Sequence, residues 1–190
     1  VFLTTAVLAG CRHPASSATP GDPVGSETIR IAGQFGLVYA PLMIARDKEI
    51  FAKYGLTVEW KEYGSGGAVR EALTSGDLDV GFMGIPPFLI GWDKGVPGKV
   101  AIGFVCAPVS LVSYHPEIKT IKDFKADDKI ALPSPGSIQH ILLAMQAEKI
   151  LGDPKALDNQ LIALPHPDAT SAMLAQKDID AHFTTPPYIF

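Results

Sequence analysis

Two short loops rich in glycine and serine are the clearest candidates for a binding site in this sequence. Gly64-Ser65-Gly66-Gly67 and Ser134-Pro135-Gly136-Ser137 each stand directly before an apolar stretch with helical spacing. The unpaired backbone N–H groups at a helix start attract an anion, by about 0.3–1 kcal/mol per helix end at the surface. Serine is also a common N-cap residue, so each serine alone fits capping as well as binding. The repetition of the loop favours binding.

The other reactive residue types form no catalytic or metal-binding motif. The first loop lacks the Lys-Ser/Thr ending of a nucleotide-binding loop, and no G-x-S-x-G elbow occurs. The five histidines form neither an HExxH motif nor a cluster with cysteine. We therefore expect no catalytic residue, no metal and no cofactor. Two aspartate pairs, Asp77/Asp79 and Asp178/Asp180, precede predicted strands and are interpreted as turn residues away from the site.

These aspartates belong to a motif that the sequence contains twice. Residues 77–82 read DLDVGF and residues 178–183 read DIDAHF, and a Pro-Pro pair with an aromatic residue follows each. A spacing of about one hundred residues exceeds the roughly 20–50 residues of a solenoid unit. The duplication therefore predicts two similar lobes with a cleft between them. Gly84-Ile85 and Thr184-Thr185 precede the prolines, and we expect them to face each other across that cleft.

Alternating strand and helix patterns position these loops. Strands are predicted at residues 28–33, 56–63, 78–83, 100–107, 129–134, 161–164 and 180–184, with an extended stretch at 109–114. Helices are predicted at residues 39–48, 68–75, 86–95, 121–124, 137–151 and 168–176. Such alternation with short connections indicates parallel sheets joined by right-handed crossovers. Cys106, near the end of a predicted strand, is expected to be buried. The apolar stripe expected to face the core in the helix at 137–151 consists of Ile138, Ile141, Leu142, Met145 and Ile150.

Ligands of open parallel sheets bind at the carboxyl ends of the strands. The loops at those ends supply the candidate ligand-binding residues Gln34, Phe35, Tyr39, Ser65, Gly66, Gly84, Ile85, Ser137, Ile138, Gln139, His140, Thr184 and Thr185. Phe35 and Tyr39 would form an aromatic wall, although packing in the core fits them equally well. No arginine lies in these loops, so a strongly anionic ligand is not required and a neutral or aromatic one is compatible with them.

The composition fits either one large domain or two small ones. The chain has 190 residues, is 47% hydrophobic and carries a net charge of −4, which allows a substantial core. This mild acidity gives no basic stripe for nucleic acid, and no internal apolar run reaches the ~18 residues of a membrane span. We expect lobe 1 at residues 28–107 and lobe 2 at residues 108–190. With only three predicted strands, lobe 2 is expected to be incomplete, and the chain is interpreted as a fragment.

Residues 1–11 resemble the end of a secretion signal. Their last four letters, LAGC, resemble the bacterial lipobox, in which a peptidase cuts before the cysteine and lipid is attached to its thiol, here that of Cys11. A buried cysteine at the end of an apolar strand is the alternative. Residues 12–27 are rich in Pro, Ser, Gly and Ala and are expected to form a flexible tether. These segments predict an extracytoplasmic protein that is anchored to the membrane by lipid.

Taken as a set, the motifs resemble the nitrate/sulfonate/taurine family of periplasmic substrate-binding proteins, which overlaps a group named for thiamine-pyrimidine precursors. The resemblance covers residues 28–190 and rests on IRIAGQFGLVYAPLMIARDKEIFAKYGLTVEW, GSGG, ALTSGDLDVGFMGIPPF, IKTIKDF and DIDAHFTTPPY. It implies a periplasmic-binding-protein-like (type II) α/β fold, with two lobes of parallel sheets that close on a ligand. It also implies a monomeric lipoprotein that delivers a small solute to an ABC permease and its ATPase, without binding nucleic acid.

Two positions depart from the family pattern. Many relatives carry glycine where Glu49 stands, and many carry serine or threonine where Ile85 stands, a side chain that a sulfonate-like ligand would use. The main alternative is an enzyme on the same fold, of the pyrimidine-precursor synthase or lyase type. It would need a general base, and His140 and His166 are the only bases near the candidate loops. The lipobox argues against a third alternative, the sensing domain of a regulator.

Overall fold

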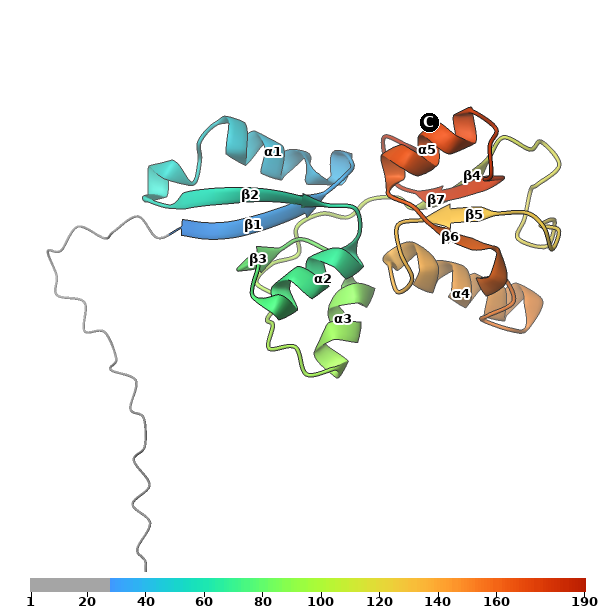
Figure 1. Cartoon of the computed structure of the whole chain (residues 1–190), viewed down its shortest axis with the longest axis horizontal. Coiled ribbons are helices and arrows are strands. Elements are labelled where there is room, and N and C mark those ends of the chain that lie inside the picture. Colours follow the sequence, from blue (N-terminus) through green and yellow to red (C-terminus); the bar gives the residue numbers. More distant parts are fainter. Residues whose placement is uncertain (1–27) are drawn as a thin grey trace, which may run out of the picture.

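The computed structural model describes residues 28–190, which form two α/β lobes placed side by side (Figure 1). The predicted lipobox and tether, residues 1–27, lie outside the described residues. Within the described part of the chain, no helix is both long enough and apolar enough to cross a membrane.

Lobe 1 is a three-stranded parallel sheet with strand order β2-β1-β3. Its strands are β1 (Thr28–Gln34), β2 (Thr57–Tyr63) and β3 (Val80–Gly81), and its helices are α1 (Ala40–Asp47), α2 (Gly66–Ser75) and α3 (Ile85–Asp93), with 3-10 turns at η1 (Leu37–Tyr39) and η2 (Ala52–Tyr54). Helix α2 begins at its N-cap Ser65 and ends at Gly76, whose φ of 80° is a left-handed conformation that glycine adopts without steric cost. Its buried face packs Val69 and Ala72 against the sheet.

Lobe 2 is a four-stranded sheet with strand order β4-β7-β5-β6. Its strands are β4 (Ser110–Ser113), β5 (Ile130–Leu132), β6 (Leu161–Ala163) and β7 (Ala181–Thr184), and its helices are α4 (Ile138–Leu151) and α5 (His166–Leu174), with a 3-10 turn at η3 (Asp158–Gln160). Strand β4 is antiparallel to β7, whereas β5 pairs in parallel with both β6 and β7. The stretch expected only to be extended therefore supplies a fourth strand, so the sheet is wider than the three strands predicted.

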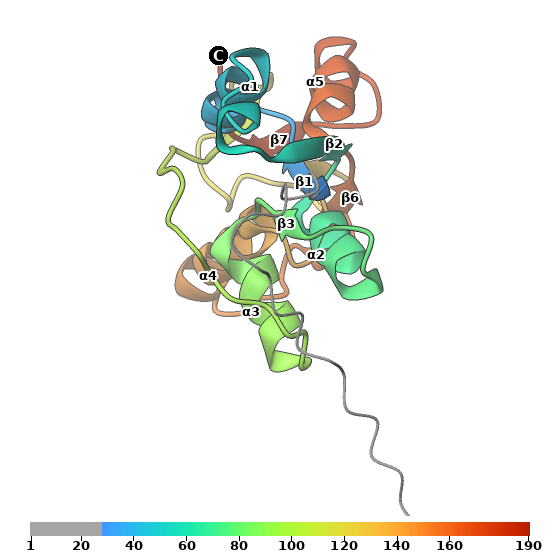
Figure 2. The same cartoon turned by 90° about the vertical axis from the view of Figure 1, so that its left-hand side faces the viewer.

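Helices cover both faces of the two sheets. Figure 2 shows α1 and α5 on one side and α2, α3 and α4 on the other. In lobe 2 the larger core lies on the α4 side, where Leu143 packs with Ile130, Leu132 and Phe183. A smaller core joins Ala131 to Ala169 of α5.

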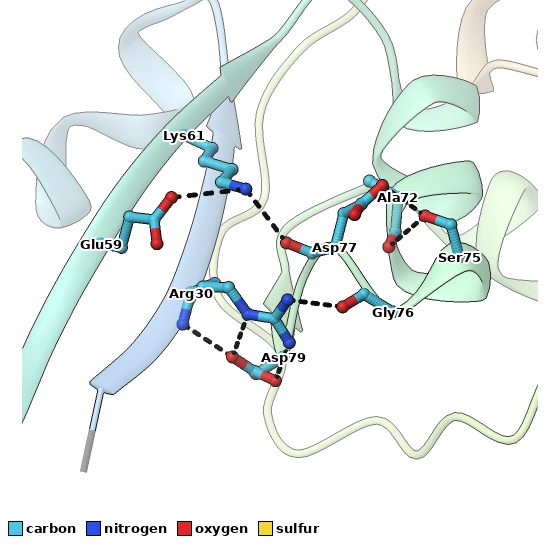
Figure 3. Close-up of polar contacts among 8 residues, drawn as sticks. All are labelled: Arg30, Glu59, Lys61, Ala72, Ser75, Gly76, Asp77 and Asp79. Atoms are coloured by element: carbon cyan, nitrogen blue, oxygen red, sulfur yellow. Dashed lines mark hydrogen bonds and ion pairs between the residues drawn. The ribbon is translucent and has the colours of Figure 1, made fainter.

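The paired aspartates close the amino ends of the sheets, as expected for turn residues. In lobe 1 the Asp79 carboxylate accepts hydrogen bonds from the Arg30 backbone N–H at 2.8 Å and from the Arg30 guanidinium at 2.7 and 3.0 Å (Figure 3). In lobe 2 the Asp180 carboxylate accepts from the Lys129 backbone N–H at 2.7 Å. The two copies of the motif thus make the same backbone contact in both lobes.

The predicted strand at 100–107 is wrong, because this segment has no regular structure. Its side chains Val100 and Ile102 are 66% and 65% exposed, and Cys106 is exposed rather than buried. A strand needs a neighbouring edge to pair with, and β3 pairs with β1 over only two residues. The segment contacts lobe 1 through Phe104, whose ring meets Phe82 edge-on at 4.6 Å.

Two helix predictions in lobe 2 also need correction. Residues 121–124 form a turn, in which the Asp123 carboxylate accepts the N–H groups of Lys119 and Thr120 at 2.9 and 2.7 Å. In α4 the buried residues are Gln139, Leu143 and Ala147, spaced four apart. Met145, expected on the core stripe, is 58% exposed, because the stripe was chosen by apolar character and the sheet beneath α4 selects a different face.

Candidate functional site

The loops at the carboxyl ends of the strands meet between the lobes, in pairs. The loop after β1 meets the turn after β7, where the Leu37 N–H donates to the Pro186 carbonyl at 3.0 Å. The loop after β2 meets the loop after β6 so closely that a Cβ on Gly64 would lie 2.9 Å from Pro165 Cγ. The loop after β3 meets the start of α4, where a Cβ on Gly84 would lie 3.2 Å from Ile138 Cβ. We call this set of loop contacts the interlobe seam.

A polar contact completes the seam at the start of α2. A Cβ on Gly67 would lie 3.2 Å from the Ser134 hydroxyl oxygen, so the first turn of α2 faces the end of β5. This oxygen is buried and has no hydrogen-bond partner among the described residues. Buried hydroxyl groups in folded proteins are normally hydrogen-bonded. Among the described residues of the seam, Ser134 therefore lacks a hydrogen bond that its buried hydroxyl would normally make. Sequence reasoning placed it in a candidate loop but did not select it.

The two serines that were selected act as helix caps. Ser65 Oγ accepts from the Ala68 N–H at 3.2 Å, and Ser137 Oγ accepts from the His140 N–H at 3.3 Å. Both side chains are buried. Gly66 is also buried, in the first turn of α2. The capping interpretation of these serines is therefore confirmed by geometry, while a role in ligand binding stays a prediction.

Gln34 and Tyr39 lie where lobe 1 opens toward the seam. The Gln34 amide donates to the Phe82 carbonyl at 2.9 Å, which ties β1 to the end of β3. Burial raises the pKa of the Tyr39 hydroxyl to about 12, against a smaller lowering by its hydrogen bond with Gln34. Both residues line a groove of about 200 Å³ between α1 and β2, whose floor includes Trp60. Phe35 is half-buried in the loop between them.

The expected opposition of Gly84-Ile85 and Thr184-Thr185 is not formed. Gly84 packs on Ile138 instead, and Ile85 is 72% exposed. Thr184 is fully buried inside lobe 2. Thr185 alone lies at the seam, where its Cγ2 would lie 3.4 Å from a Cβ on Gly36 and its hydroxyl donates to the Pro108 carbonyl at 3.3 Å. The two copies of the repeated motif therefore do not face each other: the loop after β3 faces the start of α4, and the loop after β1 faces the turn after β7.

His140 is engaged in holding its own loop. Its Nδ1 accepts from the Gly136 N–H at 2.9 Å, and its Nε2 lies 3.5 Å from the Asp158 carboxylate. The neighbouring Gln139 points the other way, into lobe 2. Its amide nitrogen lies 3.3 Å from His166 Nε2.

A buried polar network lies behind the seam in lobe 2. His166 Nδ1 is 3.0 Å from both His182 Nε2 and the Thr184 hydroxyl. His182 Nδ1 is in turn 3.4 Å from the Thr170 hydroxyl. Burial lowers the pKa of His166 to about 4. Burial, and then the neighbouring His166, lower the pKa of His182 to about 3.

Sequence reasoning missed this network. His182 stands in a predicted strand, and no local sequence pattern pairs it with His166. In residues 28–190 no group of three or more His, Cys, Asp or Glu side chains is placed to hold a metal ion. Because burial holds the pKa of both histidines well below neutral pH, the network consists of hydrogen bonds between uncharged groups.

Comparisons with known sequences agree with this architecture. A model of the NMT1-like family matches residues 23–189. A putative aliphatic sulfonates-binding protein of Bacillus subtilis is 33% identical over 134 residues, covering 66% of this chain and 38% of that protein. The taurine-binding periplasmic protein of Escherichia coli is 36% identical over 61 residues, covering 32% of this chain and 19% of that protein.

A solved structure extends the similarity to the fold. The periplasmic aliphatic sulphonate binding protein SsuA of Escherichia coli matches with a TM-score of 0.55 at 27% identity, over 85% of this chain and 55% of that chain. The two lobes thus have the periplasmic-binding-protein fold. The chain spans only part of the length of the proteins that it matches, 55% in this case.

Proposed function

The chain belongs to the NMT1-like family, and from this premise we propose that it is the solute-binding component of an ABC importer. It captures a small solute between its lobes and delivers it to a membrane permease that an ATPase drives. The names of two relatives, a taurine-binding periplasmic protein and a putative aliphatic sulfonates-binding protein, support this assignment. Nitrate and pyrimidine precursors are further candidate solutes. Cys11 carries the lipid that holds the protein, a monomer, at the outer face of the membrane.

The observation that carries the proposal is the unpaired hydroxyl of Ser134. Among residues 28–190 this seam oxygen is buried without a hydrogen-bond partner, which costs about 1–3 kcal/mol. A solute that donates to or accepts from it recovers that free energy. The hydroxyl faces the first turn of α2, whose N-terminal N–H groups favour an oxygen-rich or anionic group. Ser134 and the start of α2 would therefore hold one polar end of the solute from opposite lobes.

The charges near the seam limit the kind of solute. Arg70, the nearest arginine in α2, packs its aliphatic stem on α3, where a Cβ on Gly91 would lie 3.0 Å from Arg70 Cδ. Its guanidinium lies 3.5 Å from the Glu71 carboxylate. An anionic end of the solute is thus held by backbone dipoles and hydroxyl groups. A zwitterion or a neutral polar solute suits such a site as well as a simple anion does.

Closure couples capture to delivery. Lobes of this kind close on a ligand by a hinge movement, and the permease distinguishes the closed form from the open one. In this proposal the loop pairs of the seam form when the solute binds, and they open when the permease separates the lobes. The protein itself performs no chemical step.

Calorimetric titration of the chain tests the proposal. Taurine, ethanesulfonate, nitrate, bicarbonate and hydroxymethylpyrimidine are the solutes to be titrated. Ser134→Ala should weaken binding of the accepted solute by about tenfold, since one hydrogen bond of about 1.4 kcal/mol is lost. Ser171→Ala is the matched control, because that hydroxyl donates only to the Pro167 carbonyl of its own helix, at 2.9 Å. Turnover of a solute, or no binding of any of them, would contradict the proposal.

The lipid anchor is tested separately. Bacterial expression with a radiolabelled fatty acid should label the wild-type protein and leave Cys11→Ser unlabelled. The Cys106→Ser variant is the matched control and should keep the label, because Cys106 is the only other cysteine. A label that persists in Cys11→Ser would contradict anchoring at this residue.

A further inference from the structure

The turn at residues 134–137, between β5 and α4, brings lobe 2 against two helices of lobe 1. At its first residue, the Ser134 hydroxyl oxygen would lie 3.2 Å from a Cβ on Gly67 of α2. At its third residue, a Cβ on Gly136 would lie 3.1 Å from Ile90 Cδ1 of α3. The conformation of this turn therefore sets where the unpartnered hydroxyl of Ser134 lies relative to lobe 1.

The turn has the sequence and the geometry of type II. The Ser137 N–H donates to the Ser134 carbonyl at 3.1 Å, and Gly136 in the third position has a φ of 74°. Type II turns favour proline in the second position and need a left-handed residue, usually glycine, in the third. A type I turn differs mainly by a reversal of the peptide between these two positions, and proline followed by glycine allows both forms. The Pro135–Gly136 peptide can therefore point in either of two directions.

His140, in the first turn of α4, holds this peptide in the type II direction. Its Nδ1 accepts the Gly136 N–H at 2.9 Å. A backbone N–H can only donate, so this ring nitrogen carries no proton, and the neutral imidazole carries its one N–H on Nε2. Nε2 lies 3.5 Å from the Asp158 carboxylate, which can only accept. The hold on the peptide thus belongs to the neutral form of the ring.

Uptake of a proton by His140 removes the acceptor. A protonated imidazole carries a hydrogen on both nitrogens, so Nδ1–H would oppose the Gly136 N–H. The N–H and C=O of a trans peptide point in opposite directions, so a reversal of the peptide would turn the Pro135 carbonyl toward Nδ1–H instead. Nε2 carries hydrogen in both states, and its contact with Asp158 does not oppose the change. The ring and the peptide therefore form a two-position device that a proton resets.

The surroundings of His140 leave this device to a single charged partner. Asp158 is the ionisable group within ion-pair distance of the ring among residues 28–190. The residues three and four positions away along α4 do not ionise. Helix α3, which packs on the turn, contains Asp93 as its ionisable residue, and the loop before η3 contains Asp153 and Lys155; all three are exposed.

We propose that His140 is a positioning residue, whose neutral ring keeps the turn in its seam-forming conformation and whose protonation releases the turn and, with it, the solute. This role rests on the proposed function, and it places His140 behind Ser134 instead of in contact with the solute. Histidine side chains change charge between about pH 5 and about pH 8. The solute is therefore held at the upper end of this range and released at the lower end.

Nuclear magnetic resonance tests the hold on the peptide without a solute. In the ¹⁵N-labelled chain at about pH 8, a nitrogen–nitrogen coupling across the hydrogen bond should join the Gly136 amide to His140 Nδ1. The coupling should vanish toward about pH 5, in step with protonation of the ring, while the amide signals of α5 stay in place. Its absence at the higher pH, its persistence on the protonated ring, or its loss only together with the α5 signals would overturn the proposal.

Two substitutions separate the roles of the two ring nitrogens. In His140→Asn the amide oxygen can take the place of Nδ1 and accept from Gly136, and it carries no charge at any pH in this range. In His140→Gln the longer side chain carries its amide toward the position of Nε2 and leaves the Gly136 N–H without its acceptor. In calorimetric titrations with ethanesulfonate at about pH 8, His140→Asn should bind at least about fivefold more tightly than His140→Gln, for one hydrogen bond. Equal affinities of the two variants would overturn the proposal.

The pH profile of binding separates positioning from a merely structural role. Ethanesulfonate keeps its charge over this range, so the wild-type affinity should fall at least about fivefold from about pH 8 to about pH 5, and His140→Asn should remove most of that fall. His115→Asn is the matched control, because that ring contacts Asp180 at the amino end of lobe 2, at 2.9 Å, and it should keep the wild-type profile. Parallel profiles of the wild type and His140→Asn would overturn the proposal. If ethanesulfonate does not bind the wild type, the proposed function fails for sulfonates, whereas the coupling still decides whether His140 holds the turn.

Discussion

His166 Nδ1 and His182 Nε2 lie 3.0 Å apart inside lobe 2, so the two rings share one proton between them. Burial lowers the pKa of His166 to about 4, and burial together with His166 lowers that of His182 to about 3. The unfolded chain takes up protons on both rings below about pH 6.5 while the folded chain does not. The two neutral rings therefore make their full contribution to the free energy of unfolding above about pH 6.5. This contribution is lost as the pH falls toward about 4.

Urea unfolding should therefore show a steep loss of stability in mild acid. Between about pH 7.5 and about pH 4.5 each ring should remove roughly 2–3 kcal/mol of unfolding free energy. His182→Phe should reduce this loss by about one ring's share, whatever its effect on stability at neutral pH. A pH profile in the variant that parallels the wild type would contradict the assignment of the loss to this network.

The Arg30–Asp79 contact should give a second pH dependence, in stronger acid. The hydrogen bonds from Arg30 lower the pKa of the Asp79 carboxyl to about 2. The contribution of this group is present above its ordinary pKa of 3.8 and is lost as the pH falls from there toward about 2.

Asp79→Asn should lower the urea midpoint at neutral pH and remove that part of the acid profile. The effect should also shrink in high salt, because the pair is exposed and therefore screened. Asp93→Asn, at the exposed end of α3, is the matched control and should leave the midpoint unchanged. Equal midpoints for both variants would contradict a stabilising role of the Arg30 contact.

Glu49 should be replaceable by glycine with a gain in stability. Its φ is 51°, a left-handed conformation that costs a residue with a Cβ roughly 1–2 kcal/mol. Glycine loses more chain entropy on folding, so the net gain in unfolding free energy should be about 0.5–1 kcal/mol. Lys48→Gly is the matched control and should destabilise the protein, because Lys48 has a φ of −93°. A Glu49→Gly protein less stable than wild type would refute this account.

Gly64→Ala should hinder closure of the lobes. The added Cβ would lie 2.9 Å from Pro165 Cγ across the seam. Small-angle X-ray scattering should then give a larger radius of gyration than for the wild type, and solute affinity should fall. Gly103→Ala is the matched control, because nothing lies within 4 Å of its Cβ. An unchanged radius in Gly64→Ala would mean that the seam does not depend on this contact.

The sequence predicted the elements whose boundaries are set locally. The helix predicted at residues 68–75 ends at Ser75 as expected and begins two residues earlier, at Gly66, directly after the N-cap Ser65, because capping and a left-handed glycine act within a few residues. The twofold aspartate motif likewise indicated the same turn in both lobes, and Asp79 and Asp180 make matching backbone contacts. Apart from the strand predicted at 100–107 and the helix predicted at 121–124, the order of strands and helices followed from such local signals.

The errors arose where distant partners decide the outcome. Residues 100–107 have the composition of a strand but no edge to pair with, so Val100 is exposed. The buried face of α4 is set by the sheet beneath it, which selected Gln139 and Leu143 instead of Met145. In the site, capping by Ser65 and Ser137 was predicted as one of two alternatives, because it depends on neighbouring residues alone. The hydroxyl of Ser134, which lacks a partner among the described residues, faces Gly67 of the other lobe, a neighbour that no local pattern indicates.

The seam joins the lobes largely through glycine and proline, at Gly36 with Pro186 and at Gly64 with Pro165. Glycine brings no apolar side chain to these two contacts, so they add little hydrophobic attraction between the lobes. A weakly adhering pair can be tipped by the few kcal/mol of differential affinity that a small molecule supplies. In the proposed transport cycle, weak contacts of this kind would let the permease separate the lobes again without exposing a hydrophobic core.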